Sequence, residues 1–458
     1  MTAADQSVTG PVATRSGGGS ALAHPRVRAM AALWGAVILN LIIIEVLFFA
    51  TAPAKNALHA TGKFLGLHAA LAMLLQLVLI ARLPWLDRRL GMDRLTSWHR
   101  WTGFSLFWLV LLHPTFVMLG YAQAYDSTFL KQASNLIGMG PTMIGFIAVG
   151  IIAVAAGVSV RLARRKLSYE TWHAVHVLLY VAIVLALIHQ TYEASTFTAT
   201  TVSAVYWWSL WAFAGLSLIV GRIIVPLRRN ARMRLRVAAV VPEAENVVSI
   251  HVTGKDLDKL GARAGQFFIW RFVGYNSWWK ANPFSLSAAP GHNALRLTAK
   301  AVGETSAGLR DVPVGTRVFA EGPYGAFTSI HKTREGTVLI AGGVGVTPIR
   351  SLLEELSGPI AVLYRVQSAA DAVLLAEMEQ LARMKGAQVH VLSGRTGAGN
   401  PPNLPFAPEH LVRLVPDILE RDVFVCGPPA MTDAVLKSLR QLKVPPLQIH
   451  AERFALAS

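Results

Sequence analysis

The sequence predicts a protein of two halves: an α-helical membrane bundle of six spans, then a small β domain and an α/β domain with a doubly wound sheet. Three observations support this fold class. Hydrophobic residues make up 53% of the 458 residues and mean hydropathy is +0.44, yet the long apolar runs lie in the first half. Near residue 231 the pattern changes to short alternating or β-branched segments. From residue 337, apolar strands alternate with turns and helices.

Six apolar segments are long enough to cross a bilayer as helices. The first, Met30–Ala50, is expected to be a retained span and not a cleaved signal, because no convincing cleavage site follows its charged start. The charged Glu45 inside this run is expected to lie at the membrane–water interface or to be satisfied by a neighbouring helix. Residues 1–24, rich in Ala, Gly, Ser and Thr, predict a disordered cytoplasmic tail. The other spans are Phe64–Ile80, His99–Gly120, Gly138–Val160, Trp172–Gln190 and Ala204–Val225.

Basic residues fall on alternate connections between the spans and so predict the orientation. The positive-inside rule places both termini and everything after residue 226 in the cytoplasm of a multi-pass protein of the cell (inner) membrane. The net charge of +17 then needs no nucleic-acid partner, and membrane lipid is the expected one. The cytoplasmic set is Arg26, Arg28, Arg82, Arg88, Arg89, Arg94, Arg161, Arg164, Arg165, Lys166, Arg222, Arg228 and Arg229, against Lys55, Lys63 and Lys131 on the other side.

Two pairs of histidines lie inside apolar spans, His99 with His113 and His176 with His189. At about 1.5 Å per residue, the members of each pair are roughly 20 Å apart along their helix. An imidazole without a partner is costly in hydrocarbon, so four of them need an explanation. Metal ligation supplies one, and the spacing predicts two haems at different depths of the bilayer.

The predicted topology pairs these histidines by depth. His99 and His176 share the inner level, whereas His113 and His189 share the outer level, which gives two bis-histidine sites. On an ideal α-helix, His99 and His113, fourteen residues apart, point within about 40° of each other. His176 and His189, thirteen residues apart in the fifth span, would point about 140° apart. That span must therefore bend, or the haem planes must rotate around it. His173 is an alternative inner ligand with a worse angle.

Other polar residues of the membrane half have simpler explanations. His68 is expected to be a packed, hydrogen-bonded histidine. Arg94, Arg100 and Arg164 suit inner haem propionates, and snorkelling to lipid phosphate explains them equally well. The single cysteine, Cys426, excludes an intramolecular disulfide and a cysteine-held metal cluster, so redox chemistry would need bound cofactors.

A glycine-rich turn in the second half predicts a nucleotide site. In "AGGVGVTP", Gly342, Gly343 and Gly345 directly follow an apolar strand, so the backbone can approach a pyrophosphate near the start of the next helix. About 20 residues later, the next strand ends in Arg365, where an NAD-binding fold would often carry an acidic residue. Arginine suits a 2′-phosphate, which favours NADPH.

Several linked motifs give the chain a specific resemblance over about residues 30–458. "NPFSLS" resembles the flavin-binding signature of the ferredoxin-NADP reductase superfamily, in the form seen in ferric reductases and NADPH oxidases. "LTAKAVGETSAGL", "GPYGAF", "AGGVGVTP", "CGPPAM" and "ERFAL" follow in the order typical of that superfamily. Together with the paired histidines, these motifs make the chain similar to bacterial members of the NADPH oxidase/ferric reductase family.

The resemblance implies roles for individual residues. Ser285, Cys426 and Phe454 would lie at the reacting centre, with Ser285 near the reactive part of the flavin, Cys426 beside the nicotinamide and Phe454 covering the flavin face. Asn282 departs from the His or Arg often found at its position. The implied ligands of FAD are Pro283, Phe284, Ser285, Lys300, Gly303, Thr305 and Ser306. Those of NADPH are Gly342, Gly343, Gly345, Thr347, Pro348, Arg365, Cys426, Gly427 and Pro428, and those of the haem irons are His99, His113, His176 and His189.

The implied activity is electron transfer from NADPH through FAD and two b-type haems. NADPH gives two electrons as hydride whereas a haem accepts one, so a flavin must stand between them. The expected acceptor is oxygen, giving superoxide; a ferric chelate, giving ferrous iron, is the alternative. The chain has no EF-hand-like loop for calcium control. The expected domains are residues 25–226 for haem, a β-barrel over 231–330 for FAD and an α/β domain over 336–458 for NADPH.

Two other functions fit parts of this pattern. A haem-free flavin reductase merely anchored by its spans would explain the second half. A transporter with a nucleotide-sensing domain would explain intramembrane histidines, but the spans show no evident repeat and few acidic residues for a coupling ion. The sequence gives no indication of a protein partner.

Overall fold

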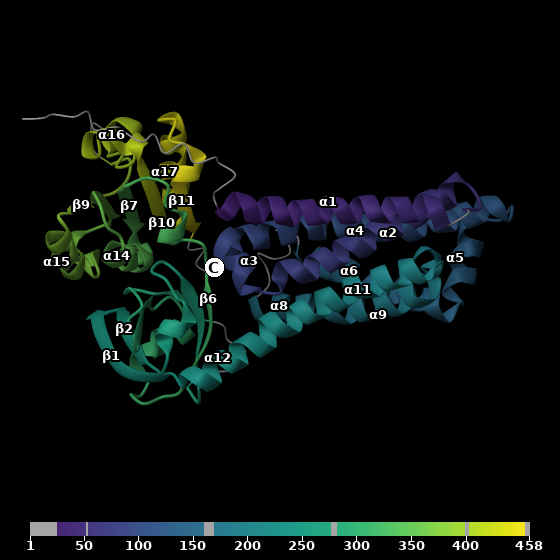
Figure 1. Cartoon of the computed structure of the whole chain (residues 1–458), viewed down its shortest axis with the longest axis horizontal. Helices are drawn as coiled ribbons and strands as arrows, with labels where there is room; N and C mark the ends of the chain where they lie inside the picture. The colour runs from purple at the N-terminus through teal and green to yellow at the C-terminus, as the bar shows by residue number, and fades with distance from the viewer. Residues whose placement is uncertain (1–24, 52–53, 160–168, 276–281, 399–402, 454–458) are drawn as a thin grey trace, which may run out of the picture.

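The computed structural model describes residues 25–51, 54–159, 169–275, 282–398 and 403–453. A rod of long helices joins two soluble domains at one end (Figure 1). The expected tail over residues 1–24, the basic residues Arg161, Arg164, Arg165 and Lys166, and Phe454 lie outside the described residues.

Six helical segments of the described chain are long and apolar enough to cross a membrane, as the sequence predicts. Most are longer than the expected apolar cores, because the helices continue beyond them. The spans are α1 (Pro25–Thr51), α2 (Ala57–Ile80), α4 (Met92–Ala124), α6 (Gly140–Ser159), the pair α8 (Tyr169–Val177) and α9 (Leu179–Glu193), and α11 (Thr201–Ile219), with η2 (Val220–Ile224) and α12 (Val225–Met233) extending the last.

Short elements connect the spans. The helix α3 (Pro84–Leu90) lies at the soluble end, where α2 turns into α4, and α5 (Phe129–Ile137) and α10 (Ser195–Thr198) lie at the far end (Figure 1). Local capping fixes several helix starts. The Asn56 side chain accepts from the His59 amide at 2.9 Å before α2, and Thr200 and Ser203 form a reciprocal capping box at the start of α11.

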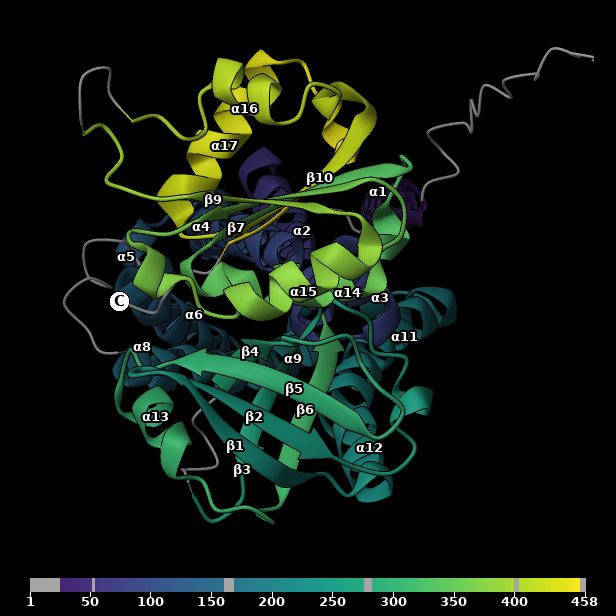
Figure 2. The same cartoon turned by 90° about the vertical axis from the view of Figure 1, so that its left-hand side faces the viewer.

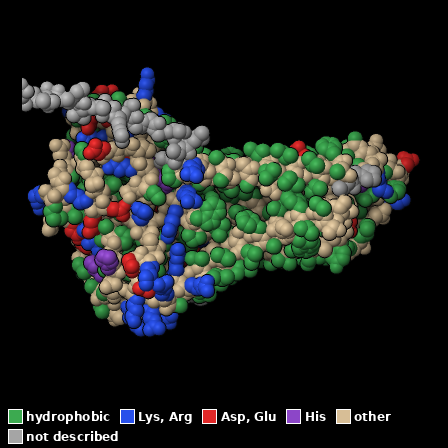
Figure 3. All heavy atoms as spheres, viewed as in Figure 1, with side chains coloured by type: hydrophobic (Ala, Val, Ile, Leu, Met, Phe, Trp, Pro, Cys, Tyr) green, Lys and Arg blue, Asp and Glu red, His purple; other side chains and the backbone are tan. Residues whose placement is uncertain are grey.

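The membrane bundle has a small core and an apolar outer surface. Ile44, Met73 and Trp207 are buried between the helices, whereas Phe49 is 80% exposed and Val205 is 60% exposed. Hydrophobic side chains cover the rod, and Lys and Arg gather where it meets the soluble domains (Figure 3). Such a surface needs lipid around it.

The first soluble domain is a closed barrel of short antiparallel strands. One sheet has the order β1 (Arg236–Ala244), β2 (Val247–Thr253), β5 (Ala294–Lys300), and the other β4 (Asn282–Ser285), β3 (Phe267–Phe272), β6 (Val318–Tyr324). Isolated bridges Leu286↔Leu297 and Arg236↔Arg317 join the two sheets at both sides. Their inner faces meet around Trp270, Phe268 and Phe272, all less than 2% exposed.

The second soluble domain is the expected doubly wound α/β fold. Its five parallel strands have the order β11 (Ile449–Arg453), β10 (Arg421–Gly427), β7 (Gly336–Gly342), β8 (Ile360–Arg365), β9 (Gln388–Leu392). The turn η6 (Gly343–Gly345) leads from β7 into α14 (Val346–Glu355). The remaining α-helices are α15 (Leu375–Lys385), α16 (Pro408–Leu414) and α17 (Pro429–Gln441), and helices cover both faces of the sheet (Figure 2).

A partly buried ionic network joins the two soluble domains. Arg296 of β5 donates to both oxygens of the Glu377 carboxylate of α15, at 2.8 and 2.9 Å. Arg350 of α14 approaches the same carboxylate at 2.8 Å. Burial would raise the pKa of Glu377, but the two guanidiniums outweigh it and hold that pKa below its usual range. The network therefore fixes the orientation of the α/β domain on the barrel.

Candidate functional site

The four predicted histidines form two facing pairs inside the bundle. The ring centres of His99 on α4 and His176 on α8 are 6.2 Å apart. Those of His113 on α4 and His189 on α9 are 6.5 Å apart, at the level farther from the soluble domains. The structure thus brings together the same partners that the topology predicts. His173 is exposed, so His176 and not His173 is the histidine that faces His99.

The fifth span breaks between its two histidines, which reduces the angular mismatch expected from the sequence. Leu178 separates α8 from α9, and its amide bonds back three residues to Val175 at 3.2 Å. A three-residue turn rotates the chain further per residue than an α-helical one. The two short helices can therefore present His176 and His189 toward the same neighbour, α4.

Main-chain carbonyls orient the outer pair. Nδ1 of His113 lies 2.7 Å from the Gly62 carbonyl oxygen, and Nδ1 of His189 lies 3.0 Å from that of Pro141. A carbonyl only accepts, so each Nδ1 carries the proton and each Nε2 is left with a free lone pair. A metal-ligating histidine has this arrangement, because the hydrogen bond at one nitrogen fixes the ring while the other nitrogen binds.

Two glycines make room for the outer imidazoles. A Cβ on Gly66 of α2 would lie 2.7 Å from Nδ1 of His113, and one on Gly145 of α6 would lie 2.9 Å from Nδ1 of His189. Real side chains do not tolerate such separations. Any residue other than glycine at these positions would push the rings from their places.

The inner pair is held differently. The His176 ring stacks on Trp172, one turn earlier, with 5.0 Å between ring centres. Nδ1 of His99 and Nδ1 of His176 are buried, and neither forms a well-aligned hydrogen bond within the described part of the chain. The main chain of Gln76 lies near the His99 ring. Buried ring nitrogens of this kind require a partner.

The spacing of both pairs fits an iron held in a porphyrin. A metal–nitrogen bond of about 2 Å on each side, plus the two ring radii, adds up to roughly the observed separation of the ring centres. Among the described residues, no group of three or more His, Cys, Asp or Glu side chains comes together. Two protein ligands per site suit a haem, whose macrocycle supplies the other four.

The predicted flavin strand, β4, is the outer strand of its three-stranded sheet, next to the bridge to β5. Ser285 is 2% exposed, and its Oγ is buried without a hydrogen-bond partner among the described residues. Phe284 is half-buried, and its carbonyl accepts from Nε1 of Trp270 at 3.1 Å. The amide of Asn282 donates to the Trp270 carbonyl at 3.3 Å, so this residue is anchored in the sheet. An unpartnered buried hydroxyl in this position is suited to a polar ligand atom.

The residues expected at the FAD phosphates surround one loop. Lys300 is exposed at the end of β5. The Ser306 hydroxyl accepts from the amides of Val302 and Gly303 at 2.9 and 3.1 Å, which closes the turn into α13 (Glu304–Ala307). Thr305 lies in α13, between these residues.

The two nucleotide motifs of the α/β domain meet at the carboxyl ends of their strands. A Cβ on Gly345 would lie 2.2 Å from the Cys426 carbonyl oxygen, so only glycine permits this approach. Thr347 donates to the Val344 carbonyl at 3.0 Å, and Pro348 lies in the first turn of α14, where no amide proton is needed. Gly342 and Gly343 precede this helix, and Gly427 and Pro428 precede α17. Crevices of this kind bind ligands in doubly wound sheets.

Arg365 lies at the end of β8, as expected, but its guanidinium is engaged by main-chain oxygens. Nη1 donates to Val366 at 2.6 Å and to Leu392 at 2.9 Å. Nη2 donates to the Gly394 carbonyl and to the Thr396 hydroxyl. This residue therefore anchors the chain after β9, and a phosphate would have to compete with these carbonyls.

The strands of Ser285 and Cys426 approach each other across the domain boundary. Ser285 pairs with Phe267 in β3, and Cys426 pairs with Glu452 in β11. A Cβ on Gly325 would contact Phe267 at 3.3 Å and the Glu452 carboxylate at 3.9 Å, so both side chains lie next to Gly325.

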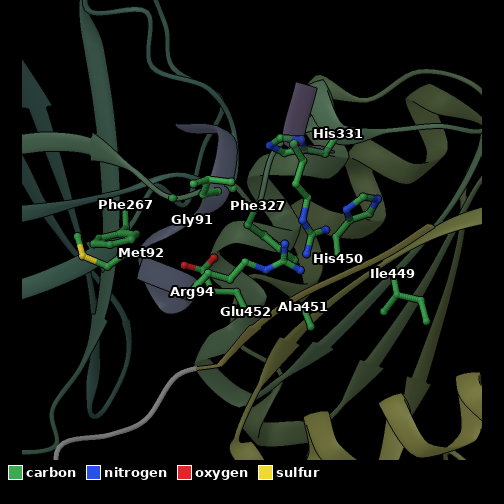
Figure 4. Close-up of a pocket in the computed structure, with 14 residues that line it drawn as sticks. Gly91, Met92, Arg94, Phe267, Phe327, His331, Ile449, His450, Ala451 and Glu452 are labelled. Carbon is green, nitrogen blue, oxygen red and sulfur yellow. The ribbon is translucent and has the colours of Figure 1, made fainter. Parts of the chain in front are cut away.

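A cavity of about 90 Å³ opens at this point, between the barrel, the α/β domain and the start of α4 (Figure 4). It is lined by Phe267 and Glu452 together with Gly91 and Arg94. The motif "ERFAL" contains Glu452, but the sequence did not single out this residue as part of a site. The available signal was an acidic residue inside the last strand, β11.

Family comparisons agree with the two halves. Residues 65–187 match the family described as ferric reductase like transmembrane component, and residues 339–437 match the oxidoreductase NAD-binding domain. The reductase component of propane 2-monooxygenase from Mycolicibacterium goodii is 29% identical over 48% of this chain and 67% of its own length. The ferredoxin–NAD(+) reductase component of the alkene monooxygenase system from Xanthobacter autotrophicus is 32% identical over 42% and 61%.

Dual oxidase 2 from Sus scrofa is 22% identical over 83% of this chain and 29% of its own length. The chain thus spans about two thirds or less of each of these relatives. Among solved structures, the FAD/NAD-binding domain of nitric oxide dioxygenase from Vibrio cholerae has a TM-score of 0.39 at 24% identity, covering 49% of this chain and 99% of that domain. The chain thus carries a segment similar to the ferric reductase like transmembrane component, followed by a segment similar to the oxidoreductase NAD-binding domain.

Proposed function

We propose that this chain is a transmembrane flavohaem oxidoreductase that moves electrons from cytoplasmic NADPH, through FAD and two b-type haems, to an extracytoplasmic acceptor. The observation that carries the proposal is the pair of facing imidazole sites, with ring centres 6.2 and 6.5 Å apart at two depths of one bundle. Flavin would convert a two-electron hydride donor into single electrons, and haem iron would accept them one at a time.

Each half of the chain contributes its own residues. His99 with His176, and His113 with His189, would hold the two irons, and the Gly62 and Pro141 carbonyls keep the outer rings in the binding tautomer. The barrel would hold FAD through Pro283, Phe284 and Ser285 at the ring and Lys300, Gly303, Thr305 and Ser306 at the phosphates. NADPH would bind along Gly342, Gly343, Gly345, Thr347 and Pro348, with Cys426, Gly427 and Pro428 at the nicotinamide and Phe454 over the flavin.

The proposed acceptor is oxygen, reduced to superoxide, and a ferric chelate is the alternative for the same architecture. One-electron reduction of either needs no protein general base. The basic belt at the soluble end supports a cytoplasmic position of both soluble domains in the cell membrane (Figure 3).

A spectrum of the purified full-length protein tests the proposal. After expression with haem supplementation, we expect a reduced-minus-oxidised difference spectrum with a dithionite-sensitive Soret band, and two haems per chain. NADPH should produce the same band anaerobically, and admitting oxygen should yield superoxide. A yellow protein without iron would instead support a haem-free flavin reductase, and ferric-chelate reduction without superoxide would support the alternative acceptor.

The proposed preference for NADPH predicts an effect at Arg365. The substitution Arg365→Ala should raise the KM for NADPH more than the KM for NADH, because only NADPH carries the 2′-phosphate. Steady-state kinetics with both nucleotides measures the two ratios. Because Arg365 also anchors the loop after β9, equal increases would mean that its role is structural and that the phosphate binds elsewhere.

A further inference from the structure

A buried carboxylate of the barrel, that of Glu321, joins the barrel to the membrane bundle. Glu321 of β6 is 7% exposed, and its Oε1 lies 2.5 Å from Nη1 of Arg82, which follows the second span. Its Oε2 lies 3.2 Å from Nη1 of Arg271 of β3. The Tyr324 hydroxyl also donates to Oε1, at 3.1 Å, and the Arg82 guanidinium lies over the Tyr324 ring. We call these four residues the junction cluster.

The electrostatics keep Glu321 ionised at neutral pH. Burial would raise its pKa, but the charges of Arg82 and Arg271 outweigh burial and hold the pKa of Glu321 below its usual range. Burial and the neighbouring carboxylate raise the pKa of Tyr324, so its hydroxyl stays protonated as a donor. The contact is therefore a charge-assisted one that only a carboxylate can complete.

Membrane-domain side chains hold the main chain on both sides of Glu321. The Asn230 side chain of α12 donates to the Ala320 carbonyl at 2.7 Å and accepts from the Ala320 amide at 2.8 Å. Arg229 donates to the Gly322 carbonyl. Asp87 of α3, 1% exposed, accepts from the Gly325 amide at 2.8 Å. Residues 320–325 are thus docked onto α3 and α12 together.

This docked segment lies between the two places where the proposed function needs cofactors. Across the barrel sheet, Ser285 pairs with Phe267, and Phe267 pairs with Tyr324, so the flavin strand is two strands from the junction cluster, about 10 Å. On the membrane side, α3 leads directly into α4, where His99 lies seven residues after Met92, about 10 Å along the helix.

We propose that Glu321 is a positioning residue for electron transfer: with Arg82, Arg271 and Tyr324, it fixes the distance from the flavin strand to the inner histidine pair. This inference rests on the proposed function. It predicts that breaking the junction cluster slows the passage of electrons into the membrane domain but leaves the reaction of NADPH with flavin intact. A small displacement between reacting groups has a large kinetic effect.

Amide exchange tests the docking without any cofactor. The amides of Ala320 and Gly325 donate to membrane-domain side chains, so they report on the contact directly. In Glu321→Gln, hydrogen–deuterium exchange should rise in peptides covering residues 318–325 and stay unchanged in β2 and β5. The matched control is Asp417→Asn, which breaks an ion pair with Arg421 inside the α/β domain, away from the junction, and should change neither region.

Anaerobic stopped-flow spectroscopy tests the kinetic consequence in the holoenzyme. With NADPH, flavin bleaching in Glu321→Gln should keep the wild-type rate, whereas haem reduction should slow by about tenfold or more. If Glu321→Gln does not fold, Arg82→Gln breaks the same contact from the membrane side, and Arg82→Lys should recover part of the rate by retaining the charge.

The outcomes separate the inference from the proposed function. Unchanged exchange in residues 318–325, unchanged haem reduction, or equal slowing of flavin and haem reduction would each overturn the positioning role. If the wild-type protein binds no haem, the proposed function fails, and the exchange result alone decides whether Glu321 docks the two domains.

Discussion

Replacing either outer histidine should stop electron transfer to the outer acceptor while NADPH still reduces the flavin. In His113→Ala or His189→Ala, the facing imidazole remains but has no partner across the 6.5 Å gap between ring centres. A haem with one of its two axial protein ligands missing is expected to bind poorly, so the haem content should fall from two toward one per chain. Haem quantification, the Soret band and turnover with oxygen or a ferric chelate measure the effect.

Two other histidines serve as controls for this prediction. The control His173→Ala should keep both haems, because His173 is exposed. By contrast, His176→Ala replaces an inner ligand and should lose the inner haem. His68→Ala removes a different imidazole from the membrane half, one that contacts the Phe64 carbonyl and lies 3.9 Å from Glu45. If haem content and acceptor turnover stay at the wild-type level in His113→Ala and His189→Ala, these histidines do not bind iron.

The membrane half was predictable because depth in a bilayer follows from sequence position. Span length and the alternation of basic residues place His99 beside His176 and His113 beside His189, and the structure has both pairs. The bend of the fifth span was required by the helical angle, but its place at Leu178 was not predictable, because no proline or glycine marks it.

The soluble half was predictable where a motif acts through its own backbone. Gly342, Gly343 and Gly345 form the expected turn before a helix, and the close approach of Gly345 to the Cys426 carbonyl demands a residue without a side chain at that position. Arg365 is at the expected position, but its direction depends on carbonyls of a loop 27 to 29 residues away. Contacts such as Glu321 with Arg82, 239 residues apart, depend on how domains dock and leave no local signal.

Adding one methyl group beside an outer imidazole should remove the outer haem without touching a ligand. In Gly145→Ala, the new Cβ would lie 2.9 Å from Nδ1 of His189, and in Gly66→Ala, 2.7 Å from Nδ1 of His113. Both rings are pinned by hydrogen bonds to carbonyls, so they must rotate and lose those bonds to relieve the overlap. Overpacking of this kind costs about 1–3 kcal/mol of folding free energy. Haem quantification and thermal unfolding of the purified variants measure both effects.

The same helix offers a matched control with the opposite expected sign. Gly150 also lies in α6, and a Cβ there would meet nothing within 4 Å. Gly150→Ala should therefore keep both haems and stabilise the helix by up to about 1 kcal/mol, since alanine loses less conformational freedom than glycine. Equal haem content in Gly145→Ala and Gly150→Ala would show that the outer ring positions are not set by the space that Gly145 leaves. A deficit in Gly145→Ala alone would tie metal binding to the orientation of the His189 ring, because the ligand itself is unchanged.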